Sequence, residues 1–231
     1  MAKKQDKGSK KNDKKHGKKK DLKHAKLKGL KQDKAPTVGR PEVIRPPLRE
    51  VQSALKQGYR DDPDSALLTS AVFSTTGATA TSGGEDPTRV RIKVDSPAGT
   101  TFDIGAHVAV GGLEDLPCSG DVFLASLAAC QELTIRLVAA AMGIELKRLG
   151  LRVEGDWDVR GTLAVSRESP IGFTAIRVLV DLDVDAPADK IARLLSSAER
   201  FCVVSATLKD APPVELIATI EGAPVGEAAA D

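Results

Sequence analysis

Aromatic residues are scarce in this chain of 231 residues: it has one Trp, one Tyr and five Phe. This scarcity argues against an aromatic-lined ligand cage. None of the seven lies in residues 1–40. That segment therefore has no side chain on which a nucleic-acid base could stack.

Histidine is also scarce, and His107 is the only one outside residues 1–40. CxxC and HExxH spacings are absent, so no zinc site is expected. No GxSxG motif accompanies His107, which leaves a Ser-His-Asp triad without support. GxGxxG and P-loop motifs are missing as well, so nucleotide binding is not expected. The sequence predicts neither a metal nor a cofactor.

The three cysteines, Cys118, Cys130 and Cys202, are few and odd in number. This is unlike a disulfide-stapled secreted domain. The first 40 residues hold no apolar stretch of the kind that forms a secretory signal. The apolar stretch 122–144 contains Gln131, Glu132 and Arg136, which favours a buried helix over a membrane span. We expect a cytoplasmic protein without a membrane span.

Charge is divided unevenly along the chain. Residues 1–40 hold 15 Lys and one Arg against four Asp, a net charge of +12, whereas the other 191 residues carry −10. We expect residues 1–47 to be a disordered Lys-rich tail with a Pro-rich linker, and residues 225–231 to be frayed. Two roles remain open for the basic tail. It contacts nucleic acid or another polyanion non-specifically through residues 1–40, or it is a solvated solubility segment.

The body of the chain alternates strand and helix patterns in a simple order. An extra helix is predicted first, and then β-β-β-α-β-β-α-β, which indicates an α+β fold. Ser119 and Gly143 are suitable cap and stop residues for a helix that is apolar on nearly every face, and such a helix is expected to be surrounded by other elements. The predicted helices span 48–59, 119–142 and 187–202, and the predicted strands span 66–73, 90–94, 102–110, 151–160, 174–184 and 214–220.

The helical pattern places Cys130 and Cys202 on apolar faces. Buried cysteines are usually inert, so patterning alone leaves a packing role and a reactive pair both open. Cys118 precedes Cys130 by 12 positions, about 18 Å of helical rise. A disulfide needs Cα atoms within about 7 Å, so Cys118 cannot pair with Cys130 of its own chain. Cys118 is therefore either a buried packing residue or a cross-subunit or regulatory thiol.

Two cysteine motifs resemble those of the OsmC/Ohr family of thiol peroxidases. CSGDVFLASLAAC (residues 118–130) is similar to the helix that carries the family's first cysteine, and AERFCVVSATL (residues 198–208) is similar to its second-cysteine motif. EGDWDVRGTLAV and GFTAIRVLVDLDVDA resemble the strands between them. The resemblance extends over about residues 65–221, and the order of elements derived above agrees with it.

The resemblance implies a fold, an activity and a set of partners. Family members are intertwined homodimers with central helices between wrapped sheets. Carried over, Cys130 attacks an organic hydroperoxide and becomes a sulfenic acid, and Cys202 resolves it as a disulfide. The reductant is then a thiol or lipoyl-type carrier. The alternative is a protein of the same fold that has little redox activity and either binds a small molecule or acts as a thiol sensor.

In the family, an Arg held by a Glu ten residues before the first cysteine activates the thiolate. Gly120 occupies that position here, with Asp121 beside it as a substitute. A cation is needed because Cys130 lies beyond the first helical turn, where the macrodipole has faded. The candidate thiolate-activating arginines are Arg60, Arg89 and Arg91. Arg160 matches a recurring family position and is expected to be structural or accessory, pairing with Asp156, Asp158 or a carboxylate of a second chain.

Overall fold

The computed structural model describes residues 46–74, 86–220 and 223–224. The predictions for the basic tail and for residues 225–231 fall on segments outside these ranges, except that Pro46 and Pro47 are exposed and directly precede the first helix.

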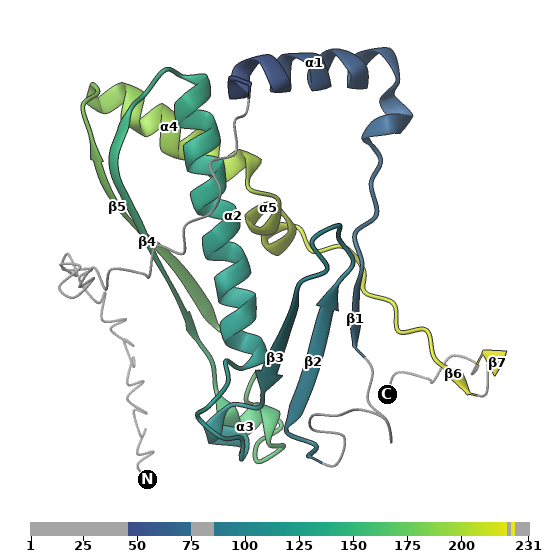
Figure 1. Ribbon diagram of the computed structural model, residues 1–231. Helices are drawn as coiled ribbons and strands as arrows, with labels where there is room; N and C mark the ends of the chain where they lie inside the picture. Colours follow the sequence, from purple (N-terminus) through teal and green to yellow (C-terminus); the bar gives the residue numbers. More distant parts are fainter. Residues whose placement is uncertain (1–45, 75–85, 221–222, 225–231) are drawn as a thin grey trace, which may run out of the picture. The chain divides into compact units, whose positions relative to one another are not determined.

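The described residues form an α+β fold, which confirms the predicted class (Figure 1). Every predicted helix is present, and α3 and α5 are additional. The helices are α1 (Leu48–Asp61), α2 (Ser119–Ala141), α3 (Val159–Thr162), α4 (Ala188–Phe201) and α5 (Val203–Lys209), with 3-10 turns η1 (Pro63–Ala66) and η2 (Val108–Val110). The strands are β1 (Val72–Ser74), β2 (Arg89–Val94), β3 (Thr101–Gly105), β4 (Leu146–Asp156), β5 (Ala175–Val184), β6 (Thr219–Ile220) and β7 (Ala223–Pro224).

The strands pair in three antiparallel groups. β1, β2 and β3 form one sheet in that order, β4 pairs with β5, and β6 pairs with β7. In the β4–β5 pair, Leu151 lies opposite Val180 and Val153 lies opposite Val178. α2 packs along β4 and against α4 and α5, so the middle of α2 meets the junction between those two helices (Figure 1).

The core lies where α2 and α4 cross the inner face of the β4–β5 pair. Ile135 and Leu194 are fully buried, and Ala139, Ile144 and Ala198 complete the cluster. The inner face is apolar because the inward positions of the strands are taken by Leu, Val and Ile. Burying each large aliphatic side chain contributes about 1.5–3 kcal/mol.

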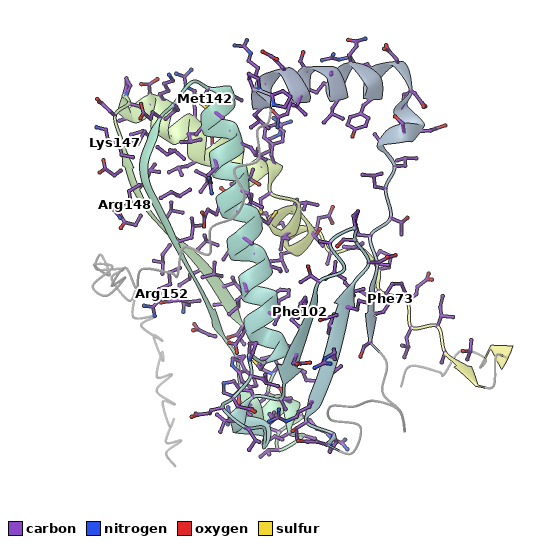
Figure 2. The ribbon with its side chains drawn as sticks, viewed as in Figure 1. Phe73, Phe102, Met142, Lys147, Arg148 and Arg152 are labelled. Atoms are coloured by element: carbon purple, nitrogen blue, oxygen red, sulfur yellow. The ribbon has the colours of Figure 1, made fainter. Side chains whose placement is uncertain are left out.

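The outer face of β4 is charged. Figure 2 shows Lys147, Arg148 and Arg152 on the side of the β4–β5 pair away from α2. Arg148 pairs with Asp181 of β5, and a register shift between Leu146 and Arg148 sets the direction of the side chains that follow. Exposed ion pairs contribute little stability, so this face keeps the sheet soluble rather than holding it together.

Two glycines are required by their surroundings. Gly143 has φ +63° and ends α2, as the sequence predicted. Gly155 lies under the ring of Phe173, and a Cβ there would be 2.6 Å from that ring. The same ring stacks on Phe123 of α2, with centroids 5.6 Å apart. The residues just before β5 therefore pack against α2.

Several strand predictions were wrong in extent. Of the predicted strand 66–73, only Val72 and Phe73 are extended in β1, because Pro63 starts a 3-10 turn that runs to Ala66. Arg160 lies on α3 rather than on a strand, because Asp158 accepts a hydrogen bond from the Arg160 backbone N–H and begins a helical turn. Of the predicted strand 214–220, only β6 forms. Pro212 and Pro213 have no N–H to donate just before it.

α2 is less enclosed than its composition predicted. One face carries the buried residues, but Leu133 on the other face is 57% exposed. By length and composition alone α2 is apolar enough to cross a membrane, with mean hydropathy 1.5 over its most apolar window. Its packing on β4, α4 and α5 is that of a core helix in a globular domain, as the sequence predicted, with one face left open in a single chain.

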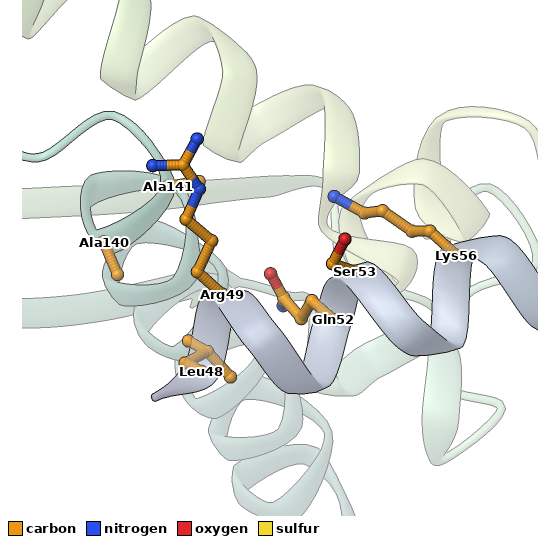
Figure 3. A pocket seen from close by; sticks show the side chains of 7 residues that line it. All are labelled: Leu48, Arg49, Gln52, Ser53, Lys56, Ala140 and Ala141. Atoms are coloured by element: carbon orange, nitrogen blue, oxygen red, sulfur yellow. The ribbon is translucent and has the colours of Figure 1, made fainter. Parts of the chain in front are cut away.

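α1 lies apart from this core. None of its residues is buried. A small cleft of about 250 Å³ separates it from the end of α2 (Figure 3). Leu48, Arg49, Gln52, Ser53 and Lys56 of α1 line it on one side, and Ala140 and Ala141 of α2 line it on the other.

Candidate active site

Two cysteines from distant parts of the sequence meet beside α2. Cys130 lies in the middle of α2, and Cys202 lies between the end of α4 and the start of α5. The two thiols are close enough for each to shift the pKa of the other. Cys130 is half-buried and Cys202 fully buried, and both are free thiols.

The position of Cys202 follows from the apolar stripe of α4. Leu194, Ala198 and Cys202 recur every four residues and all have no exposed surface. The helix ends at Phe201, and the backbone of Cys202 turns extended, with φ −77° and ψ 107°. The sulfur of Cys202 then caps α5 by accepting the backbone N–H of Ser205 at 3.5 Å.

The first amides of α5 point at the other sulfur. Burial disfavours the charged form of Cys130 and is the largest single influence on its pKa. The backbone N–H groups of Val204 and Val203 and the thiol of Cys202 outweigh it, with a smaller contribution from the Thr134 hydroxyl, and the pKa of Cys130 is held below its ordinary value. Hydrogen bonds donated to a thiolate favour the charged form.

The pKa of Cys202 is shifted in the opposite direction. Burial raises its pKa above the ordinary value, and the neighbouring Cys130 raises it further. A thiolate on Cys130 stabilises the protonated form of Cys202, which then donates its S–H. When the pair loses its first proton, the negative charge therefore lies preferentially on Cys130.

Neither α5 nor its amides were predicted from the sequence. Cys202-x-x-Ser205 has the spacing of a helix N-cap and its third residue, but cysteine is outside the usual set of capping residues. Only the folded chain brings those amides to Cys130, which lies more than 70 positions earlier.

Cys118 and Asp121 take part in a different structure. The carboxylate of Asp121 accepts the backbone N–H of Cys118 at 2.9 Å, and the sulfur of Cys118 accepts the backbone N–H of Asp121 at 3.4 Å. This reciprocal pair is a capping box that begins α2. Asp121 is nine residues from Cys130 along the same helix, about 13 Å of rise, so its carboxylate serves the helix start within its own chain.

The four arginines singled out from the sequence are engaged elsewhere. Arg91 makes two hydrogen bonds to Asp103, at 2.6 and 2.9 Å. Arg89 pairs with Asp86 and Asp115. Arg160 pairs with Asp158 at 2.6 Å, and Arg60 donates to Gln57 at 3.2 Å. Among the residues that the structure describes, the contacts of Cys130 are amide, thiol and hydroxyl groups, and no cation is among them.

A cavity of about 630 Å³ lies beside the cysteine pair. It is bounded by α2, β5, α4 and α5. Leu127 and Gln131 line it from the same stretch of α2 that carries Cys130, and Ser205 lines it from α5.

A second hollow, of about 440 Å³, lies at the other end of α2 and includes Cys118. His107 lines it, with its Nδ1 accepting the backbone N–H of Ala109 at 3.0 Å and its ring edge-on to Trp157. His107 is thus a satisfied side chain at a turn. In the described part of the chain no group of His, Cys, Asp and Glu side chains is arranged to hold a metal ion.

Comparison with known proteins gives one family match. Residues 112–217 match the family model described as OsmC-like protein, and no curated protein matches the chain. Similar solved structures include an OsmC-like protein from Mycoplasma pneumoniae, at 14% identity over 62% of this chain and 89% of that one, with a TM-score of 0.49. They also include the organic hydroperoxide resistance protein OsmC of Legionella pneumophila (19% identity, 62% and 91% covered, TM-score 0.45) and OhrB of Bacillus subtilis (22%, 62% and 93%, 0.40). Residues 112–217, which include both cysteine motifs, thus match the model of the family that those motifs resemble.

Proposed function

We propose that this protein is a thiol-dependent peroxidase that reduces organic hydroperoxides, with Cys130 as the peroxidatic and Cys202 as the resolving cysteine. The observation that carries the proposal is the asymmetric pair. The amides of α5 and the thiol of Cys202 lower the pKa of Cys130, whereas burial and Cys130 raise the pKa of Cys202. The OsmC-like family match agrees with this chemistry.

The first step uses the thiolate on Cys130. Its sulfur attacks the terminal oxygen of the hydroperoxide, and the O–O bond breaks. The alkoxide leaves and takes a proton to become the alcohol, and Cys130 is left as a sulfenic acid. The sulfur is oxidised and the hydroperoxide is reduced by two electrons. The first amides of α5 keep the sulfur ionised and therefore nucleophilic.

The second step uses the neighbouring thiol. The sulfur of Cys202 attacks the sulfenic sulfur, hydroxide leaves and combines with the proton of the Cys202 thiol as water, and a Cys130–Cys202 disulfide forms. A dithiol then reduces this disulfide by two exchange steps and becomes oxidised itself. The closeness of the two thiols, each of which shifts the pKa of the other, supports this pairing.

The direct test is turnover by the full chain. With dihydrolipoamide as reductant, we expect the protein to consume cumene hydroperoxide catalytically, and faster than hydrogen peroxide. Equal efficiency with the two oxidants would remove the organic-hydroperoxide preference. Oxidation of the pair without catalytic turnover would overturn the peroxidase proposal.

A thiol sensor is the second candidate, and the arginine contacts favour it. The three candidate thiolate-activating arginines, Arg60, Arg89 and Arg91, contact other groups, and within the described part of the chain no cation contacts Cys130. A sensor oxidises once and stays oxidised until it is reset. The turnover assay separates the two, because a sensor reacts with one equivalent of hydroperoxide and then stops.

We also propose that the protein is a homodimer in which a second copy covers the open face of α2. Leu133 and Leu137 of that face are 57% and 39% exposed, and the apolar residues Val214 and Leu216 are 95% and 94% exposed. Exposed large apolar residues on a core helix are typical of an interface.

Replacing Leu133 with Asp is expected to convert the dimer into a monomer, because a carboxylate at the centre of a buried interface is unpaired. Light scattering coupled to gel filtration measures this mass. The matched control is Leu163→Asp, since Leu163 is 50% exposed but lies next to α3. An unchanged dimer in Leu133→Asp would contradict this placement of the interface.

A further inference from the structure

The hollow at the start of α2 brings together aromatic side chains from distant parts of the sequence. Its volume is about 440 Å³, and its walls come from the end of β4, from α3, from the turn at η2, from the first residues of α2 and from the segment before β5. The rings of His107, Trp157 and Phe173 belong to the lining. Neither Cys130 nor Cys202 is among its described lining residues, so this hollow is separate from the cysteine pair.

The ring of Phe173 is held by neighbours from two elements. It lies against β4 at Gly155 and against α2 at Gly120, where an added Cβ would be 2.6 and 3.4 Å from the ring. Phe123 of α2 stacks on it, with the two ring planes 16° apart. This wall of the hollow is therefore formed before any ligand enters, and a preformed wall lowers the entropy cost of binding.

Two ring N–H groups supply the hollow with hydrogen-bond donors. The Nδ1 atom of His107 accepts the backbone N–H of Ala109, so the neutral ring carries its proton on Nε2. The indole of Trp157 meets the His107 ring edge-on, with centroids 5.4 Å apart. Among the described residues, neither the Nε2–H of His107 nor the indole N–H of Trp157 has a hydrogen-bond partner. Both residues are half-buried, and every fully enclosed side-chain nitrogen of such described residues does have a partner, so both N–H groups reach open space.

The charge at the hollow disfavours an ionic ligand. The carboxylate of Asp121 lines it and has no ion-pair partner in the described part of the chain, so it would repel an anion. A cation could pair with Asp121 but would leave both ring N–H groups without an acceptor. A neutral molecule that carries an acceptor oxygen avoids both disadvantages.

The geometry points to a binding site for a neutral, planar aromatic compound that carries a carbonyl group. Its ring packs against Trp157 and Phe173, because aromatic pairs gain energy beyond the area that they bury. Its carbonyl oxygen, which only accepts, takes hydrogen bonds from the ring N–H groups. A volume of about 440 Å³ lies within the range of small-molecule sites. This binding uses neither Cys130 nor Cys202, so it is independent of the proposed peroxidase activity. The rest of the apolar lining is aliphatic and includes Val110, Leu124 and Ile171.

The test compares two probes of similar shape on the full-length protein. Acetophenone carries the carbonyl, and ethylbenzene lacks an acceptor. His107→Asn keeps a side-chain acceptor for the Ala109 N–H but has no Nε2–H. We expect calorimetry to show that this variant lowers the ratio of acetophenone affinity to ethylbenzene affinity about tenfold, because one hydrogen bond between uncharged groups is lost. The ratio cancels the difference in hydration between the two probes.

Three further variants test the walls of the hollow. Phe173→Leu removes a ring and should weaken the binding of both probes. Phe102→Leu is the matched control, because Phe102 is a partly exposed ring on β3 outside this lining, and it should leave both affinities unchanged. Trp157→Phe keeps a ring and removes only the indole N–H, so it should lower the affinity ratio even if Phe173→Leu does not fold.

Two signals locate the bound molecule. Trp157 is the only tryptophan of the chain, so acetophenone should quench its fluorescence saturably, with the affinity that calorimetry gives. Cys118 lines the same hollow, so saturating acetophenone should slow its alkylation by iodoacetamide and leave alkylation of Cys130 unchanged. Protection of Cys130 instead of Cys118 would place the molecule beside the cysteine pair and overturn the proposal. An affinity ratio that does not change in His107→Asn, or benzoate that binds as tightly as acetophenone, would overturn it as well.

Discussion

Replacement of Cys130 by serine is expected to lower the consumption of cumene hydroperoxide by roughly 10³-fold or more, to the uncatalysed rate. The hydroxyl of serine is not ionised at neutral pH, so the amides of Val203 and Val204 have no anion to hold. The measurement is peroxide loss over time with dihydrolipoamide in excess.

Cys118→Ser is the matched control for this prediction. Serine is a good N-cap, so it should preserve the capping box with Asp121 and leave the rate unchanged. Turnover that survives in Cys130→Ser and disappears in Cys118→Ser would make Cys118, at the N-terminus of α2, the reactive cysteine and would contradict the account.

Replacement of Cys202 separates its role as the resolving thiol from its role as a hydrogen-bond donor to Cys130. Cys202→Ser and Cys202→Ala both prevent the disulfide, so both should accumulate the Cys130 sulfenic acid and lose dithiol-dependent turnover. Only Cys202→Ala also removes the hydrogen-bond donor to the Cys130 sulfur, whereas serine retains one. The pKa of Cys130 should therefore rise in Cys202→Ala and stay low in Cys202→Ser.

The pH dependence of alkylation measures the pKa of Cys130. The thiolate reacts with iodoacetamide and the thiol does not, so the rate at Cys130 falls as pH falls through its pKa. In a Cys118→Ser background, the midpoint should lie below that of an ordinary cysteine and should move upward in Cys202→Ala. At pH 7 we therefore expect alkylation of Cys130 to be slower in Cys202→Ala than in Cys202→Ser. Identical profiles for the alanine and serine variants would show that Cys202 does not support the thiolate.

The local pattern of the sequence predicts α1, α2 and α4 well. Gly143 ends α2 at the expected place, and the four-residue repeat of Leu194, Ala198 and Cys202 marks the buried face of α4. These are short-range features, set by helical periodicity and by the backbone preferences of single residues. The motif resemblance then singled out Cys130 and Cys202, which patterning alone could not separate from inert core cysteines.

The source of thiolate support could not be predicted in the same way. The sequence argument looked for a cation because Cys130 lies too far along α2 to benefit from that helix's own N-terminus. The structure supplies the N–H groups of another helix, α5, which starts directly after Cys202. Such long-range placement depends on how α4 and α5 pack on α2, and no local pattern near Cys130 encodes it.

The predicted extents of several strands were wrong for a related reason. Alternation predicts which residues can form a strand but not whether a neighbour is present to pair with them. Leu216 and Ile217 have the right composition, yet they remain 94% and 79% exposed in a single chain. In the dimer proposed above, a second copy would be available to cover such residues.

The most direct test of the account is the product of one oxidation. The full chain, fully reduced, is treated with one equivalent of cumene hydroperoxide, digested without reduction, and its linked peptides are identified by mass spectrometry. The account predicts one intramolecular disulfide that joins Cys130 to Cys202, with Cys118 still a free thiol. A disulfide that includes Cys118, or a protein in which Cys130 and Cys202 both remain reduced, would contradict it.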